Sequence, residues 1–143
     1  MADWCPPDQE ARDRIVAAHD RNMLVEAGAG SGKTTAMVRR LVALILTGAG
    51  TIDQIVAVTF TRKAAAELRE RFQEELENKF RAADPTSIEA QRARLALDNL
   101  DSCFLGTIHA FCARLLRERP LEAGVPPDFT EVYGAEEELL RRE

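Results

Sequence analysis

The sequence has no long hydrophobic run and few cysteines, and both absences narrow the class of protein. Its longest apolar stretch covers residues 41–46, far short of the roughly 20 residues that cross a bilayer. Residues 1–7 lack the basic start and apolar core of a secretion signal. Three cysteines without CxxC spacing, Cys5, Cys103 and Cys112, argue against a disulfide framework or a zinc site. We therefore expect a cytoplasmic protein with reduced thiols and no membrane contact.

An excess of basic residues is also lacking. The 24 acidic and 19 basic residues give a net charge of -5, so the surface as a whole should not attract polyanions. Any contact with a nucleotide or a nucleic acid must then be local. Lysine is scarce among the basic residues, and two of the lysines, Lys33 and Lys63, fall inside the motifs described below.

The 143 residues have room for about one domain, with an ordinary globular content of 45% hydrophobic residues. Hydrophobic periodicity predicts strands that alternate with helices. The expected strands are 22–26, 54–60, 103–108 and 129–133, and the expected helices begin near residues 8, 33, 63, 86, 109 and 135. Such alternation predicts an α/β fold with a parallel sheet covered by helices on both faces.

Residues 27–34, AGAGSGKT, match the phosphate-binding loop except for an alanine at the first position. Glycines let the backbone turn tightly, so that successive N–H groups and the following helix N-terminus point at an anion. Lys33 would reach the β and γ phosphates, and the Thr34 hydroxyl would bind Mg²⁺. The predicted phosphate-binding residues are Ala27, Gly28, Ala29, Gly30, Ser31, Gly32, Lys33 and Thr34, of which Lys33 and Thr34 are the catalytic candidates. The alternative is a flexible glycine turn with a solvated lysine.

Four sequence blocks, in this order, resemble the N-terminal ATP-binding domain of UvrD/RecB-type superfamily-one DNA helicases, and within them the RecB/AddA branch. The blocks are PDQEARDRI, LVEAGAGSGKTTAMVRRL, VAVTFTRKAAAELRERF and LGTIHAFCARLLRERPLEAG. An alanine at the first loop position is usual in that family, and Ile108, Phe111 and Cys112 favour the RecB/AddA branch. The resemblance implies a P-loop NTPase (RecA-like) fold that uses ATP and Mg²⁺. It also implies movement along single-stranded DNA in the 3' to 5' direction, in recombination and repair.

The resemblance assigns roles to residues outside the loop. Gln9 stands where the family has a glutamine that reads the adenine edge, and Thr35 stands where many relatives have an arginine near the nucleotide. The implied DNA contacts are Thr59, Phe60, Thr61, Arg62, Lys63, Thr107 and His109. An aromatic face can stack on any base, while hydroxyls and cations hold phosphates. The alternatives are a solvated helix-start glutamine at Gln9, a core residue at Phe60 and a helix cap at Thr107.

The sequence offers no carboxylate pair after a strand and no arginine placed to neutralise the charge that develops during ATP hydrolysis. It also stops in mid-helix by pattern, at residues 139–143. We therefore expect a fragment: a flexible tail at 1–7, then 8–143 as the N-terminal part of a helicase ATP-binding domain, truncated before the acidic (Walker B) strand. The fragment alone should be inactive, and its parent would be an ATP-dependent DNA helicase with other helicase-nuclease subunits among its candidate partners.

Two alternatives come from other classes of protein. One is a non-catalytic P-loop nucleotide-binding module, and the other is a small P-loop kinase, for which VTFTRKAAAE supplies neither an acceptor site nor a lid. Self-association through an open sheet edge is a secondary hypothesis, because an unpaired edge can pair with another chain.

Overall fold

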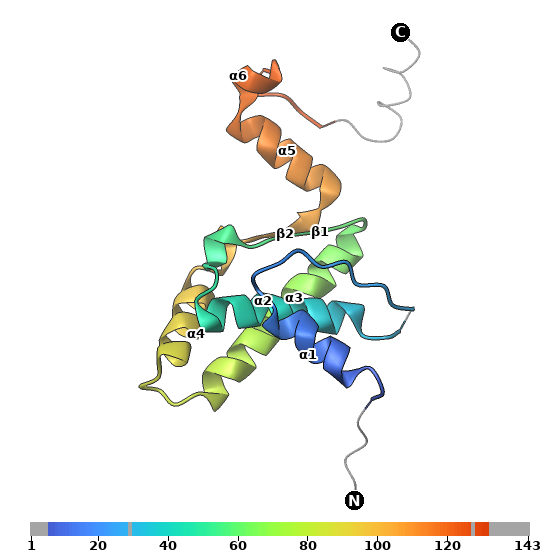
Figure 1. Ribbon diagram of the computed structural model, residues 1–143. Coiled ribbons are helices and arrows are strands. Elements are labelled where there is room, and N and C mark those ends of the chain that lie inside the picture. The colour runs from blue at the N-terminus through green and yellow to red at the C-terminus, as the bar shows by residue number, and fades with distance from the viewer. Residues whose placement is uncertain (1–5, 29, 127, 132–143) are drawn as a thin grey trace, which may run out of the picture.

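The computed structural model describes residues 6–28, 30–126 and 128–131 (Figure 1). In chain order the elements are α1 (Gln9–Ala17), α2 (Lys33–Thr47), the 3₁₀ turn η1 (Ile52–Gln54), β1 (Val56–Thr59), α3 (Arg62–Ala82), α4 (Ile88–Asp98), the 3₁₀ turn η2 (Leu100–Ser102), β2 (Phe104–Thr107), α5 (Ile108–Glu118) and α6 (Pro120–Ala123). This mixture of helices with a small parallel sheet is the predicted α/β class. Within these residues, no helix combines the length and the apolar character that a membrane crossing requires.

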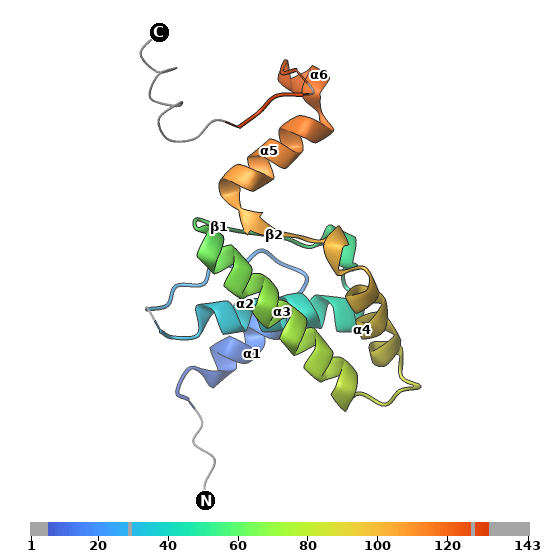
Figure 2. The same ribbon diagram turned by 180° about the vertical axis from the view of Figure 1, so that it is seen from behind.

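The strands β1 and β2 pair in parallel, with Val56 opposite Phe104 and Thr59 opposite Thr107. In both views α1 to α4 lie on one side of the strands and α5 leads away on the other (Figures 1 and 2). The second face of the sheet is covered only in part, because Val56 and Val58 are 49% and 42% exposed. The predicted cover by helices on both faces is therefore incomplete at β1, while beside β2 Phe111 of α5 packs on Phe104.

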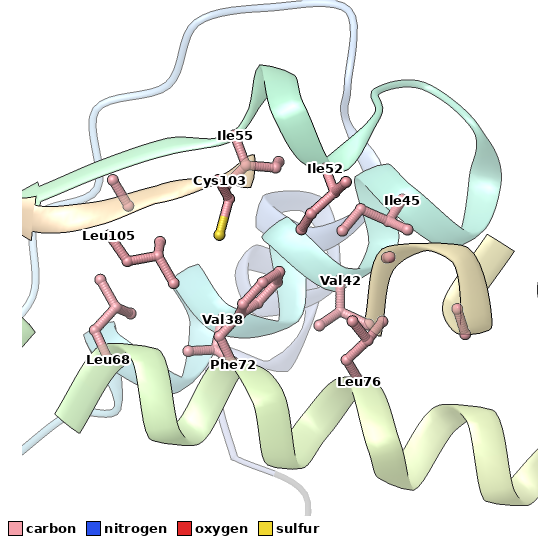
Figure 3. Packing of buried hydrophobic residues seen from close by; sticks show 13 residues of the cluster. Val38, Val42, Ile45, Ile52, Ile55, Leu68, Phe72, Leu76, Cys103 and Leu105 are labelled. Carbon is pink, nitrogen blue, oxygen red and sulfur yellow. The ribbon is translucent and has the colours of Figure 1, made fainter. Parts of the chain in front are cut away.

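One hydrophobic core joins α2, α3 and α4 to the first face of the sheet (Figure 3). Residues spaced three and four apart on α2 and α3 fall on one side of each helix and are buried there. Alternate residues of the strands, Ala57 and Leu105, point into the same core. Its buried members are Val38, Val42, Ile45, Ile52, Ile55, Ala57, Leu68, Phe72, Leu76, Ala93, Ala96, Cys103 and Leu105.

Segment 22–26, predicted as a buried strand, is neither a strand nor buried. Leu24 is 87% exposed, and in the described part of the chain the only sheet is the β1–β2 pair. A strand needs a neighbour to accept and donate its backbone hydrogen bonds, and this segment has none. The apolar run alone could not reveal that absence.

The other predicted elements have the expected type with slightly shifted ends, except at the C-terminus. Residues 129–131 form no strand, while 132 and 133 and the predicted helix at 135–143 lie outside the described residues. Of the predicted tail, only Pro6 and Pro7 are described, immediately before α1.

The two described cysteines differ in burial and should therefore differ in reactivity. Cys103 lies in the core, and burial raises the pKa of its thiol, whereas Cys112 is exposed on α5. Because the thiolate is the reactive form, we expect iodoacetamide at mildly alkaline pH to modify Cys112 rapidly and Cys103 only on unfolding. Mass spectrometry of a Cys5→Ser variant measures both rates, with a urea-denatured sample as the control. Equal rates in the native protein would contradict the core packing.

Candidate functional site

The glycine-rich loop that precedes α2 has a backbone that only glycine adopts without strain. Gly30 and Gly32 have φ angles of 76° and 89°, in the left-handed region. Gly32 is also the N-cap residue of α2. The Ser31 hydroxyl donates to the Gly28 carbonyl at 2.7 Å and closes the turn. Ala29 lies outside the described residues.

The N-terminus of α2 faces this loop and is suited to an anion. Its first intrahelical bond runs from the Ala36 N–H to the Gly32 carbonyl, at 2.9 Å, so the three preceding N–H groups have no acceptor within the helix. The first turn carries no acidic residue. The helix dipole and the three amides therefore favour negative charge at this end.

The Lys33 ammonium lies against the loop. Its Nζ donates to the carbonyl oxygens of Ala27 and Gly28, the latter at 3.0 Å. A phosphate is a stronger acceptor for an ammonium group than a neutral carbonyl, so a bound triphosphate would compete for this donor. Thr34, the predicted Mg²⁺ ligand, is half-buried at the start of α2. Thr35 instead lines a groove between α2 and α3.

A cavity of about 310 Å³ lies beside the loop. Its lining includes Asp8 and Arg12 from the start of α1, Ser31 and Lys33 from the loop, and residues 23–26 of the segment before the loop. This volume is at the lower end of the range for small-molecule sites. Gln9 is not among the lining residues, because its side-chain amide donates to the Asp13 carboxylate one turn along α1, at 2.7 Å.

A second cleft lies where β1 and β2 end. Thr61 and Thr107 are the N-caps of α3 and α5, and their hydroxyl oxygens accept from Ala64 N and Ala110 N at 3.1 and 3.2 Å. Thr107 is thus a helix cap, as one alternative held. Because a cap uses the oxygen as an acceptor, the hydroxyl hydrogen remains available to a phosphate. Two helix N-termini therefore point toward the same edge of the sheet.

This cleft, of about 340 Å³, brings together two predicted DNA-contact segments that are far apart in the sequence. Its lining includes Phe60 and Arg62 from the first segment and Thr107 and His109 from the second. Phe60 is 91% exposed, so the alternative of a core residue is wrong. The other three predicted contacts, Thr59, Thr61 and Lys63, lie next to the cleft without lining it.

An aromatic cluster supports the second cleft, and the sequence motifs did not reveal it. The ring of Phe104 lies across Gly106, where an added Cβ would come within 2.7 Å of it. The Phe104 ring also packs against Phe111 of α5, with centroids 5.4 Å apart, under the Arg114 guanidinium. A glycine two residues after an aromatic residue in a strand can signal such a close approach.

We expect Gly106→Ala to displace the Phe104 ring and to loosen the junction between β2 and α5. Forcing a methyl group into an occupied space lowers the free energy of unfolding by about 1–3 kcal/mol. Urea denaturation measures this loss. Gly50→Ala is the control, because a Cβ there would meet only Gln54 at 3.7 Å, an ordinary contact. Similar stability of the two variants would show that the ring does not need the space above Gly106.

Each of the two parallel strands leads into a helix, and a phosphate-loop sequence precedes α2. These features together define an α/β nucleotide-binding protein. The chain belongs to the UvrD/REP helicase N-terminal domain family, whose model matches residues 8–140. The family resemblance seen in the four sequence blocks is therefore confirmed.

Similar proteins come from several bacteria. The chain is 37% identical over 147 residues to an ATP-dependent helicase/nuclease subunit of Syntrophomonas wolfei, in a match that covers 100% of the chain and 11% of that protein. It is 41% identical to the protein of that name in Levilactobacillus brevis, over 75% of the chain and 8% of the relative. It is 35% identical to the exonuclease/helicase subunit RexA of Lactococcus lactis, over 92% of the chain and 11% of the relative. The chain thus spans about a tenth of the length of these relatives.

Proposed function

We propose that this chain is the N-terminal, ATP-binding part of a DNA helicase motor, with an ATP site and a single-stranded DNA site on one α/β unit. The observation that carries the proposal is the second cleft, where the exposed Phe60 ring lies beside two capped helix N-termini. A stacking surface for bases next to donors for phosphates is the arrangement that single-stranded nucleic acid requires.

At the ATP site, the residues of the loop bind and orient the triphosphate. The free N–H groups at the start of α2 donate to phosphate oxygens, and Lys33 leaves the loop carbonyls to pair with them. Thr34 is the candidate Mg²⁺ ligand. A Mg²⁺ ion held there would supply positive charge that offsets the charge of the phosphates. Gln9, on the first turn of α1, is the candidate adenine reader once its amide leaves Asp13.

At the DNA site, a base stacks on Phe60, while the Thr61 and Thr107 hydroxyls and the helix N-termini donate to the backbone phosphates. Arg62, Lys63 and His109 add donors, and Thr59 contributes to the strand end that holds them. The net charge of -5 makes this local supply of donors necessary.

The activity of the whole protein is part of the proposal. Relatives carry the name of ATP-dependent helicase/nuclease subunits, and we extend helicase action, 3' to 5' translocation in recombination and repair, and association with other helicase-nuclease subunits to the longer parent. The proposal includes a location in the cytoplasm, where a DNA motor meets both DNA and ATP. Hydrolysis needs acidic groups that hold Mg²⁺ and orient water, and the sequence offers no carboxylate pair after a strand. This chain should therefore bind ATP with negligible turnover.

A substitution of the exposed Phe60 ring tests the proposed DNA site. Phe60→Ala should weaken the binding of fluorescent oligothymidine about tenfold, because stacking contributes about 1–3 kcal/mol per base. Phe80→Ala is the matched control, since Phe80 is a partly exposed phenylalanine at the far end of α3. Fluorescence anisotropy at fixed salt measures both affinities. An equal loss in the two variants, or no loss in either, would remove the cleft from the proposal.

A further inference from the structure

Helix α1 has no fully buried residue, and polar contacts add to the packing of its half-buried Ile15 and Val16. At its C-terminal end, Arg40 of α2 donates to the carbonyl oxygens of Ile15 and Ala18, both at 2.6 Å. At its N-terminal end, Arg12 donates to the Ser31 carbonyl of the phosphate loop at 3.1 Å. Two guanidinium groups therefore help to position α1, and of the two Arg12 donates to the loop.

The Arg12 guanidinium is fixed on both sides. It forms an ion pair with Asp8 at 2.8 Å and holds the pKa of that carboxyl below its usual value, so the pair persists at neutral pH. On the other side it packs against Gly32, where an added Cβ would lie 3.3 Å from Arg12 Nη1. Its planar guanidinium reaches the Asp8 carboxylate and the Ser31 carbonyl through one nitrogen, Nη2, while Nη1 lies against Gly32. The Asp8 pair thus aims the fork at the loop.

The Arg12 side chain is 35% exposed, but its Nε atom is not. Arg12 Nε is buried without a hydrogen-bond partner in the described part of the chain. A buried donor without an acceptor is unfavourable, so the surrounding contacts with Asp8, Ser31 and Gly32 must hold the group there. Proteins keep an unfavourable local arrangement of this kind where the side chain must hold a fixed position.

We propose that Arg12 is a positioning residue that sets the spacing between the first turn of α1 and the phosphate loop, so that the base and the triphosphate of one nucleotide bind together. The inference rests on the proposed ATP site. Gln9 and Arg12 are three residues apart and lie on neighbouring parts of the helix surface. With the spacing fixed beforehand, binding of the triphosphate brings the base to α1 without a further ordering cost.

The proposal predicts a split between two ligands. Inorganic tripolyphosphate binds only the loop and should not depend on α1. Mg-ATP binds both the loop and α1, so its affinity should depend on Arg12. Loss of one charge-assisted hydrogen bond corresponds to about a tenfold change in affinity.

The experiment is calorimetric titration of the 143-residue chain with Mg-ATP and with Mg-tripolyphosphate. Arg12→Ala should raise the Kd for Mg-ATP about tenfold and leave the Kd for tripolyphosphate within about twofold. Arg12→Lys should give an intermediate loss, because a single ammonium cannot reproduce the fork. The control is Arg81→Ala on α3, since Arg81 pairs with Glu77, does not line the cavity beside the loop and should leave both affinities unchanged.

Equal loss of both ligands would overturn the proposal, because Arg12 would then act on the phosphates or on folding. Unchanged Mg-ATP affinity in Arg12→Ala would overturn it as well. If the wild-type chain binds neither ligand, the proposed ATP site fails instead, and hydrogen exchange then decides the role of Arg12. Faster exchange of the amides at residues 13–18 in Arg12→Ala and Arg12→Lys, but not in Arg81→Ala, supports positioning, and equal exchange contradicts it.

Discussion

Replacement of Lys33 by alanine is expected to weaken Mg-ATP binding by about 100-fold. The ammonium is the one cation inside the described part of the loop, where it now donates to the Ala27 and Gly28 carbonyls. In the bound state it would donate to two phosphate oxygens, and two hydrogen bonds to a charged group together correspond to about two powers of ten in affinity. The loss should be as large for tripolyphosphate, because Lys33 acts on the phosphates and not on the base.

Two further variants make the Lys33 experiment specific. Lys33→Arg keeps the charge but changes its shape and should bind poorly, since the loop closes around a compact ammonium. Lys79→Ala removes an exposed lysine near the end of α3 and should bind as the wild type does. Calorimetry measures all of these affinities. Retained binding in Lys33→Ala, with the same heat as the wild type, would show that the loop is a solvated glycine turn.

Replacement of Phe72 by alanine is expected to lower the free energy of unfolding by about 3–5 kcal/mol. The Phe72 ring has no exposed surface and lies at the centre of the core, among the buried side chains of α2, α3 and β2 (Figure 3). Its loss leaves a cavity that these close-packed neighbours cannot fill. Because a small domain is stable by only about 5–15 kcal/mol, we expect a large unfolded fraction at room temperature.

Urea denaturation followed by circular dichroism measures the effect of Phe72→Ala. Phe80→Ala is the control, because Phe80 lies on the same helix but is 37% exposed. Its removal should cost about 1 kcal/mol or less, as for most surface substitutions. Equal destabilisation by the two substitutions would mean that the core is not centred on Phe72.

Local signals were enough to predict most of the helices. Thr61, Ser87 and Thr107 each accept a backbone N–H at the start of a helix, as capping residues should. Gly48 ends α2 in the left-handed conformation. These features depend on residues close in sequence, so the sequence reveals them. The predicted strand at 22–26 failed because a strand depends on a neighbour, and no periodicity reports whether that neighbour is present.

The features of the candidate sites also differ in whether they can be predicted from residues close in sequence. The phosphate loop is one continuous segment whose glycines and lysine can be recognised by spacing alone. The contact between Arg12 and Ser31 joins residues 19 positions apart, and the place of Phe104 over Gly106 depends on where α5 packs. The first has no signature in the sequence and the second only the weak signal of a glycine two residues after an aromatic residue, because both depend on how separate elements meet in space.

Titration of the wild-type chain with Mg-ATP is the most direct test that this domain holds a nucleotide at its glycine loop. Calorimetry is predicted to show saturable binding of one nucleotide per chain, which disappears in Lys33→Ala while the variant keeps the wild-type circular dichroism spectrum. Heats equal to those of dilution at high Mg-ATP concentration, from a chain shown to be folded, would contradict the account.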